Sequence, residues 1–369
     1  MRTTLRRLTA IPAVLLLVNF GGYAYAHLVR PLRAARTPYL AESLSGSRPL
    51  LPSYIEYLKG LLHLDVGAMP GGQIGQTIAA VTLQAGLTSL GLLAIVVTGS
   101  VLLGLLLGLS AVRSPHCGAA RWLTFLSTVG LAMPSFYIGG LLVLAVIAYA
   151  SSQGPGTKAL LPVQGFGWDR HLILPALALT ARPTVQIAQM TAGLLESELR
   201  KRYIVTARSI GLPWHLVRRR HALRSILAPV TLASASSVRL LMGELVLVEW
   251  LFKWPGLGNL LAQTLVPASS SAALGSSPLF LDAAVVATVL TAFATLFLLT
   301  DLVATALARA FDPRLRSTES GGSADVFADR STTTRTNWAL LAGGLISFFV
   351  FVAAVAGPAL APHDPLEEY

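Results

Sequence analysis

Seven long apolar stretches dominate this sequence and limit the folds open to it. A helix that crosses a membrane needs about 20 mostly apolar residues, because lipid offers no partner to an unpaired backbone polar group. The seven stretches that qualify cover residues 8–28, 77–110, 122–150, 172–195, 226–250, 280–308 and 337–360. Only 12% of the residues are charged, whereas about 25% is usual in soluble domains. We therefore expect an all-α, polytopic integral membrane helical bundle.

Clusters of basic residues indicate which side of the membrane each loop faces, because short cytoplasmic loops carry an excess of positive charge. The segment between the fourth and fifth stretches is the most basic, with Arg200, Lys201, Arg202, Arg208, Arg218, Arg219, Arg220 and Arg224. Placing it in the cytoplasm puts the arginines before the first stretch on the same side. We expect a multi-pass protein of the cytoplasmic (plasma) membrane with a cytoplasmic N-terminus. Residues 29–76 then form an external loop or small folded cap, although that segment is itself basic.

The first stretch imitates a secretory signal, because arginines precede it and Ala24-Tyr25-Ala26 ends it. We favour an uncleaved anchor helix, since the run is close to membrane length and further spans follow.

Composition also excludes several kinds of site. The formal net charge of +11 could indicate a nucleic-acid partner. However, the basic residues lie between apolar runs, so we expect contact with membrane lipid and no nucleic acid. The single cysteine, Cys117, allows no intramolecular disulfide and indicates no metal site. No Gly-x-x-x-x-Gly-Lys-Ser/Thr loop is present, so this chain has no nucleotide site of that kind and we expect no cofactor and no catalytic residue.

Residues 196–224 predict a helical elbow. Good helix formers extend from Glu196 to Ile210, and Gly211 is placed to adopt the left-handed conformation that ends many helices. Pro213 suits the first turn of a second helix, where its missing N–H costs nothing. A rigid elbow of this kind could dock on a partner and transmit movement. A basic loop that only sets topology and touches anionic lipid is about as plausible on these grounds.

The elbow also carries a family resemblance. Its motif is Tyr203-x-x-Thr206-Ala207-Arg208-x-x-Gly211-Leu212, followed by His221-Ala222-Leu223-Arg224 and Pro229. The run resembles the coupling-loop signature of the binding-protein-dependent permeases for dipeptides and oligopeptides. Further matches, such as Phe252-x-Trp254-Pro255-Gly256-Leu257-Gly258, extend the resemblance over nearly all of residues 1–316. One departure is that the family's general Glu-Ala-Ala opening reads Val205-Thr206-Ala207 here.

The resemblance implies the type I permease fold of ATP-binding-cassette (ABC) importers, working by alternating access. It implies four kinds of partner: a companion permease subunit, two ATP-binding subunits that hold ATP and magnesium, an extracytoplasmic substrate-binding protein and lipid. The residues that would couple to the ATPase are Tyr203, Thr206, Ala207, Arg208, Gly211, Leu212 and Pro213. Peptides are the expected substrates, although similar permeases carry nickel complexes and glutathione.

Several residues inside the stretches suggest a path through the membrane. Pro134 and Ser135 mark either a break beside a translocation path or an ordinary kink. Arg239 and Glu244 could line the path and meet the charged ends of a peptide, but we favour mutual neutralisation through neighbouring helices. For Glu249, a structural link to the following Trp254-Pro255-Gly256 loop is the simpler expectation. Gly104 and Gly108 form a GxxxG pair that usually serves close helix packing.

The predicted organisation has five parts: a first helix 1–28, the external loop 29–76, a core permease domain 77–316 with five transmembrane helices and the coupling loop 196–224, a polar linker 317–336 and a seventh transmembrane helix within 337–369. The ending Gly357-Pro358 to Pro365 resembles the first span of the companion permease. Whether the tail marks a fusion or a truncation is left open. Two other functions also stay open, namely a secondary transporter or channel and an inactive, truncated scaffold subunit.

Overall fold

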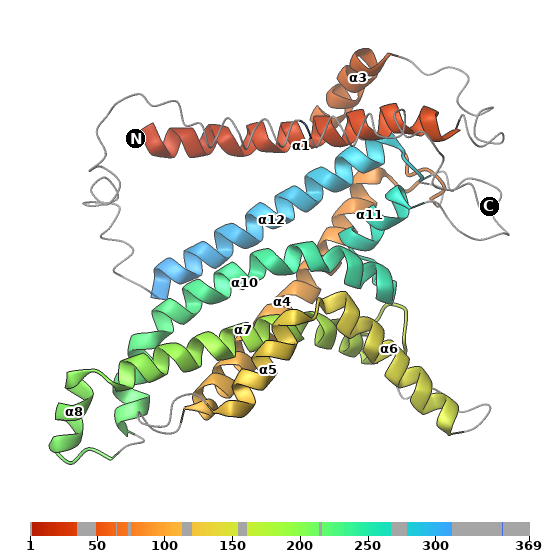
Figure 1. Cartoon of the computed structure of the whole chain (residues 1–369). Coiled ribbons are helices and arrows are strands. Elements are labelled where there is room, and N and C mark those ends of the chain that lie inside the picture. The colour runs from red at the N-terminus through yellow and green to blue at the C-terminus, as the bar shows by residue number, and fades with distance from the viewer. Residues whose placement is uncertain are drawn as a thin grey trace. The chain divides into compact units, whose positions relative to one another are not determined.

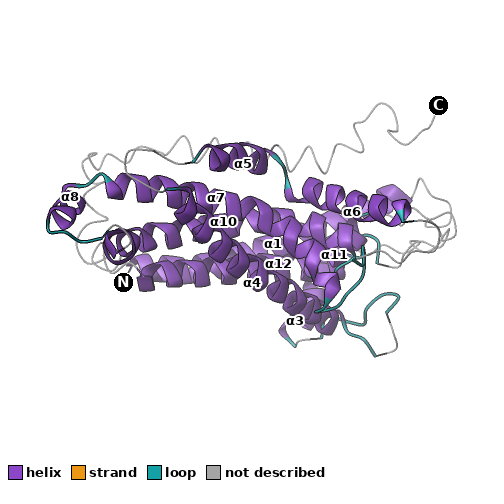
Figure 2. Cartoon of the chain, turned by 90° about the horizontal axis from the view of Figure 1, so that it is seen from below, coloured by secondary structure: helices purple, strands orange, loops and turns teal. Residues whose placement is uncertain are grey.

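The protein is helical throughout the part of the chain that the structure describes. The structure is a computed structural model, and it describes residues 2–34, 49–63, 65–72, 75–112, 120–153, 161–213, 216–266, 279–311 and 349. Figure 2 shows no strand among these residues, and their only β-type pairing is one bridge between Ala68 and Thr77. The predicted all-α class is confirmed.

The helices are labelled in Figure 1 and fall in two compact units. Their bounds are α1 (Arg2–Ala34), α3 (Leu50–Leu62), α4 (Ile78–Ala111), α5 (Arg121–Ala132), α6 (Ser135–Ser152), α7 (Ile173–Leu199), α8 (Arg202–Ser209), α10 (Leu223–Phe252), α11 (Leu257–Leu265) and α12 (Ala283–Phe311). The first unit comprises residues 1–79, 263–291 and 318–369, and the second comprises residues 80–262 and 292–317.

Four of the described helices are long and apolar enough to cross a membrane. These candidate spans are Ile11–Pro31, Ile78–Ala111, Ser135–Ser152 and Ala283–Ala304. Helices α7 and α10 cover the predicted stretches 172–195 and 226–250 but are more polar. They pack on each other, and α7 also packs on α5 and α6, so much of their surface meets protein and needs less apolarity. The predicted span 337–360, with its linker and tail, lies outside the described residues.

The predicted single span 122–150 is wrong, because two helices occupy that stretch. Helix α5 ends at Ala132, Met133 and Pro134 are extended, and α6 begins at Ser135. A proline has no N–H to donate and disfavours helical backbone at the residue before it. The 12 residues of α5 are too few to cross a membrane alone.

Glycines bring α4 against α7 in the second unit. A Cβ added to Gly104 would lie 2.7 Å from the Ile187 Cβ, and one added to Gly108 would lie 2.6 Å from the Ala188 carbonyl oxygen. Only glycine permits so close an approach of two helix backbones. The predicted packing role of this GxxxG pair is confirmed.

A polar cluster joins α1 to α3 and to the start of α12 in the first unit. The buried Asn19 amide donates to the Tyr57 hydroxyl at 3.0 Å and to Thr291 Oγ1 at 2.9 Å. The Tyr54 hydroxyl donates back to Asn19 Oδ1 at 3.2 Å. A buried amide inside a span is tolerated when it is hydrogen-bonded in this way. The segment predicted as external, 29–76, therefore contains a packed helix, α3.

Candidate coupling elbow and intramembrane charges

The elbow begins with a break that the sequence did not predict. Instead of one helix over 196–210, α7 ends at Leu199, Lys201 is extended, and the short helix α8 covers Arg202–Ser209. Figures 1 and 2 both show α8 beyond the ends of α7 and α10. The chain therefore turns twice before it returns into the bundle.

The second turn is the one that Gly211 and Pro213 predicted. Gly211 has φ +87°. Its N–H donates to the Arg208 carbonyl at 2.9 Å, and the Leu212 N–H donates to the Ala207 carbonyl at 3.4 Å. These two bonds define a Schellman motif, which satisfies the last carbonyls of a helix. The Pro213 carbonyl then accepts from the Val217 N–H at 3.2 Å, so a new helix starts at the predicted place.

That new helix opens with a π-helical segment, Val217–Ala222, and continues as α10. Trp214 and His215, which precede Leu216 in the sequence, lie outside the described residues. The Arg218 guanidinium donates to the Val112 carbonyl just after α4, at 3.2 Å. This bond ties the segment to a second helix of the same unit.

The underside of the elbow is buried in an apolar cluster. Ile204 and Ala207 of α8 pack there with residues of the flanking helices, Leu195, Leu199, Val217 and Ile226. Ala207, one of the residues expected to meet a partner, thus faces the core of this unit. Its small side chain lets α8 lie close to the helices beneath it, which fixes the position of the other elbow residues.

A buried carboxylate, that of Glu198, links the first turn of the elbow to α10. It accepts from Lys201 Nζ at 2.5 Å and from the Tyr203 hydroxyl at 2.6 Å, and Ser225 of α10 also bonds to it. Burial alone would raise the pKa of Glu198, but these hydrogen bonds outweigh burial and lower it. Burial and the bond to Glu198 raise the pKa of Tyr203 to about 12. The network therefore stays ionised at Glu198 and neutral at Tyr203 over the physiological pH range.

The outer face of the elbow is exposed and partly apolar. Six of the seven predicted coupling residues are exposed, namely Tyr203, Thr206, Arg208, Gly211, Leu212 and Pro213. Val205 and Ile210, which were not predicted, lie among them with 64% and 76% of their surface exposed. Exposed apolar residues on a fixed scaffold are typical of a protein docking surface. Val205 and Ile210 could have been found from the sequence, since both are apolar residues in a basic segment.

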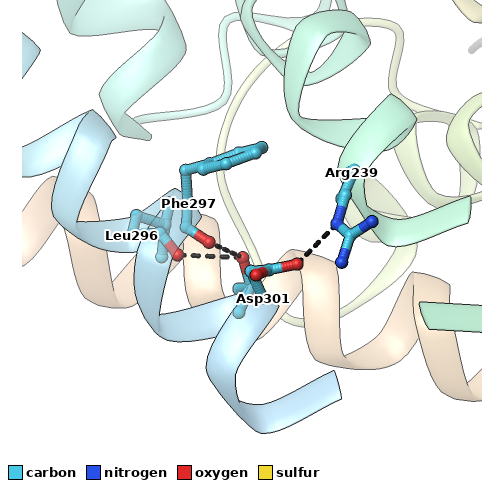
Figure 3. A network of polar contacts seen from close by, with 5 residues as sticks. Arg239, Leu296, Phe297 and Asp301 are labelled. Atoms are coloured by element: carbon cyan, nitrogen blue, oxygen red, sulfur yellow. Dashed lines mark hydrogen bonds and ion pairs between the residues drawn. The ribbon is translucent and has the colours of Figure 1, made fainter. Parts of the chain in front are cut away.

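The charges inside the spans pair differently from the prediction. Glu244 of α10 forms an ion pair with Arg182 of α7 and accepts from the Ser135 hydroxyl of α6. Arg239 instead donates from Nε to Asp301 of α12 at 2.5 Å (Figure 3). The predicted pairing of Arg239 with Glu244 is therefore wrong, although each of the two is neutralised by a residue of a neighbouring helix. Five residues along a helix correspond to about 140° of rotation, so the two side chains leave α10 on different sides.

Of the residues predicted to line a path, the structure brings together Pro134, Ser135 and Glu244, at the break between α5 and α6. It places Arg239 elsewhere on α10, with Asp301. Asp301 was not among the predicted residues, but a signal existed, because it interrupts the apolar run 280–308.

Glu249 anchors the loop after α10, as predicted. It is fully buried, accepts from Ser89 Oγ at 2.7 Å, and its other carboxylate oxygen accepts from the Gly258 N–H at 2.7 Å. A Cβ at Gly256 would lie 2.2 Å from the Glu249 carboxylate, so the loop must have glycine there. Because Gly258 is in the first turn of α11, the carboxylate also caps that helix.

Several candidate membrane spans, with ion pairs between helices, define a multi-pass membrane protein. The chain belongs to the family described as binding-protein-dependent transport system inner membrane component, whose model matches residues 100–317. The predicted resemblance to this family is confirmed. The likeness of the tail to a companion permease stays a prediction.

Similar proteins carry names from peptide transport. The chain is 30% identical to the oligopeptide transport system permease protein AppB of Bacillus subtilis (strain 168), over 57% of this chain and 67% of that protein. It is 26% identical to the dipeptide transport system permease protein DppB of Escherichia coli (strain K12), over 71% of this chain and 86% of that protein. The di/tripeptide permease DppB of Pseudomonas aeruginosa (strain UCBPP-PA14) is 30% identical, over 58% of this chain and 70% of that protein.

Proposed function

We propose that this chain is a membrane-spanning subunit of an ATP-driven importer that carries short peptides across the cytoplasmic membrane, with its N-terminus in the cytoplasm. The importer would contain a companion permease, two ATP-binding subunits that hold ATP and magnesium, and an external substrate-binding protein. The names of the similar permeases support the substrate class. The basic residues of the elbow support its cytoplasmic location.

The construction of the elbow carries this proposal. Its underside is buried in an apolar cluster, its first turn is hydrogen-bonded through Glu198 to Ser225 of α10, and its outer face presents Val205, Ile210 and Leu212. A loop that only set the topology would require basic residues but no fixed, apolar outer face. A surface built in this way suits a groove on an ATP-binding subunit.

Movement at the elbow would reach the membrane helices through its buried contacts. Closure of the ATP-binding subunits would displace α8. The Glu198 bonds to Lys201, Tyr203 and Ser225 would transfer that displacement to α7 and α10. Transmission requires that the elbow bind the closed ATPase differently from the open one. The two outcomes would be an inward-open and an outward-open arrangement of the bundle, which is alternating access.

The break between α5 and α6 supports a path near Pro134, Ser135 and Glu244. Backbone that leaves helical form at membrane depth must meet protein or a water-filled cavity. Arg182, the partner of Glu244, also has a buried Nε that finds no hydrogen-bond acceptor among the described residues. We propose that these residues line the path. A passing carboxylate or carbonyl oxygen could serve that N–H.

Crosslinking from the elbow tests the proposed function. A cysteine replaces Ser209, an exposed residue of α8 whose hydroxyl bonds to the Thr206 carbonyl in its own helix, in a Cys117→Ala background. We expect a bifunctional reagent to capture an ATP-binding subunit in membranes, with a yield that changes when ATP is added. Ser151→Cys, at the end of α6 and bonded likewise to the Ala148 carbonyl, is the matched control and should capture none.

Two results would contradict the proposal. One is equal capture from both cysteines, which would mean that the reagent reports proximity by chance. The other is an elbow cysteine that reacts readily with a soluble thiol reagent but captures no protein with or without ATP, which would leave a loop that only sets topology.

A further inference from the structure

Helix α3 meets α1 at a level inside the candidate membrane span. The Tyr54 ring centroid lies 5.1 Å from that of Phe20 and 5.3 Å from that of Tyr23. The Tyr57 ring centroid lies 5.1 Å from that of Tyr23. Phe20 and Tyr23 are near the middle of the candidate span Ile11–Pro31, and Figure 1 shows α3 beside the second half of α1. The helix therefore lies beside spanning residues and not beyond the end of the span.

An ion pair at the ends of α1 and α12 gives a reference level for this depth. Arg30 and Asp282 approach to 3.6 Å, where the candidate span of α1 ends and that of α12 begins. At about 1.5 Å per residue, Asn19 lies about 16 Å from Arg30 along α1, and Thr288 lies about 9 Å from Asp282 along α12. Both bond to the Tyr57 hydroxyl. Since the hydrocarbon core is about 30 Å thick, that hydroxyl lies in the half that adjoins the ion pair.

The bonds to α3 keep it at this level. Asn19 is 2% exposed, its amide donates to the Tyr57 hydroxyl, and its carbonyl oxygen accepts from the Tyr54 hydroxyl. If α3 moved away into solution, Asn19 would lose both phenols at a depth where lipid offers no replacement. The position of α3 is therefore fixed by a polar group inside the span.

The side of α3 that does not meet α1 carries an apolar stripe. Leu51, Ile55 and Leu62 are 63%, 51% and 79% exposed. Leu58, which lies between them, is half-buried. Residues three and four apart are neighbours on a helix surface, so these side chains form one row. The 13 residues of α3 extend only about 20 Å as a helix, too little to cross the membrane.

The stripe lies between a packed face and a polar edge. Tyr57 faces α1, whereas Lys59 and Glu56 are exposed. At about 100° per residue, Lys59 is turned about 80° from Leu51 and Tyr57 about 120° in the opposite direction. A helix in a membrane surface has this pattern, because it presents an apolar face to acyl chains and a charged edge to headgroups.

The neighbouring surface of α1 is also apolar and exposed. Phe20, which contacts Tyr54, is 40% exposed, and Leu16 and Leu17, one turn earlier, are 52% and 73% exposed. Water is an unfavourable neighbour for both helices at this level.

We propose that α3 lies in the outer leaflet of the bilayer and that lipid acyl chains cover its apolar stripe. Lys59 and Glu56 extend toward the headgroups, since long side chains can keep a charge in water while their stems lie on apolar surface. The helix is then an anchor within the membrane and not part of a cap in solution. Assignment to the outer leaflet rests on the proposed orientation of the chain, whereas the contact with lipid does not.

Fluorescence quenching from single cysteines tests the proposal. Ile55→Cys and Leu62→Cys are made separately in a Cys117→Ala background and labelled with a thiol-reactive fluorophore. The complex of permease and ATP-binding subunits is then placed in phosphatidylcholine nanodiscs. We expect both labels to lose fluorescence when the lipid carries an acyl-chain nitroxide and to keep it in aqueous iodide. Two positions are used so that the test survives if one variant fails to assemble.

Two further cysteines are the controls. Lys59→Cys, on the polar edge of the same helix, should be quenched by iodide more strongly than Ile55→Cys. Ser209→Cys, exposed on the elbow, should be quenched by iodide and not by the lipid nitroxide. In spheroplasts an impermeant thiol reagent should modify Lys59→Cys and leave Ser209→Cys unmodified.

Three results would overturn the proposal in distinguishable ways. Quenching of both stripe labels by iodide and not by lipid would place α3 in solution. Quenching by neither would mean that another protein chain, such as a companion permease or a binding protein, covers the stripe. If the impermeant reagent modified Ser209→Cys and not Lys59→Cys, the outer-leaflet assignment would fail together with the proposed orientation. The first two results would leave the proposed function intact.

Discussion

Replacing Gly211 by alanine should loosen the elbow, and the size of the effect follows from the backbone. Gly211 has φ +87°, and a Cβ built there meets nothing within 4 Å. The cost is therefore conformational and not steric, about 1–2 kcal/mol for an L-residue in left-handed backbone. Such a cost corresponds to a change of roughly 5- to 30-fold in a local opening equilibrium. Asparagine, which tolerates this conformation better, should cost less.

Hydrogen exchange measured by mass spectrometry on the purified complex would report this opening. Peptides that cover 202–213 should exchange faster by about that factor in Gly211→Ala, and peptide transport should fall with it. Gly193→Ala is the matched control, because Gly193 is helical and a Cβ there also meets nothing within 4 Å. Helical alanine is favoured over glycine by roughly 0.5–1 kcal/mol. Unchanged elbow exchange in Gly211→Ala, or equal acceleration in both variants, would refute the reasoning.

Three further predictions concern packing, pH and a buried anchor. Gly108→Ala should lower the melting temperature of the purified complex, since overpacking costs about 1–3 kcal/mol, whereas Gly140→Ala, which meets nothing within 4 Å, should not. The pKa of Tyr203 is raised from 10.0 to about 12, so the stability due to its neutral phenol is complete below pH 10 and is lost as the pH rises through 12. The phenolate absorbance of wild type minus that of Tyr203→Phe should therefore develop near pH 12, and development near pH 10 would contradict the bond to Glu198. Glu249→Ala should lower the melting temperature by more than Glu249→Gln, because it strands two buried donors at about 1–3 kcal/mol each; equal melting curves would show that the carboxylate is no anchor.

The second turn of the elbow could be predicted from local sequence, whereas the first turn could not. Gly211 and Pro213 each restrict the backbone by themselves, so the second turn could be predicted from two residues. The break at Lys201 has no such residue. There the buried Glu198 bonds to Lys201 and Tyr203 and also to Ser225 of α10, which is distant in sequence. A tertiary contact of this kind overrides helix propensity.

The charged residues within the apolar stretches were likewise predictable only in part. Their existence was evident, because any ionisable residue in an apolar run is conspicuous. Their pairing was not, because it depends on which helices adjoin α10. Arg182 and Asp301 come from α7 and α12, far from Glu244 and Arg239 in sequence. Helical geometry could have excluded the pairing of Arg239 with Glu244, since residues five apart leave the helix on different sides.

The π-helical segment Val217–Ala222 determines where two permeases can be joined when the elbow of one is transferred to the other. A π turn holds more residues than an α turn. The residues that precede it are therefore rotated about the helix axis relative to α10. One residue corresponds to about 100° around a helix. A transplanted elbow joined with one residue too few would keep its own fold yet point to a different side of the bundle. Chimeras should therefore be joined after Ala222, with the whole segment taken from a single parent.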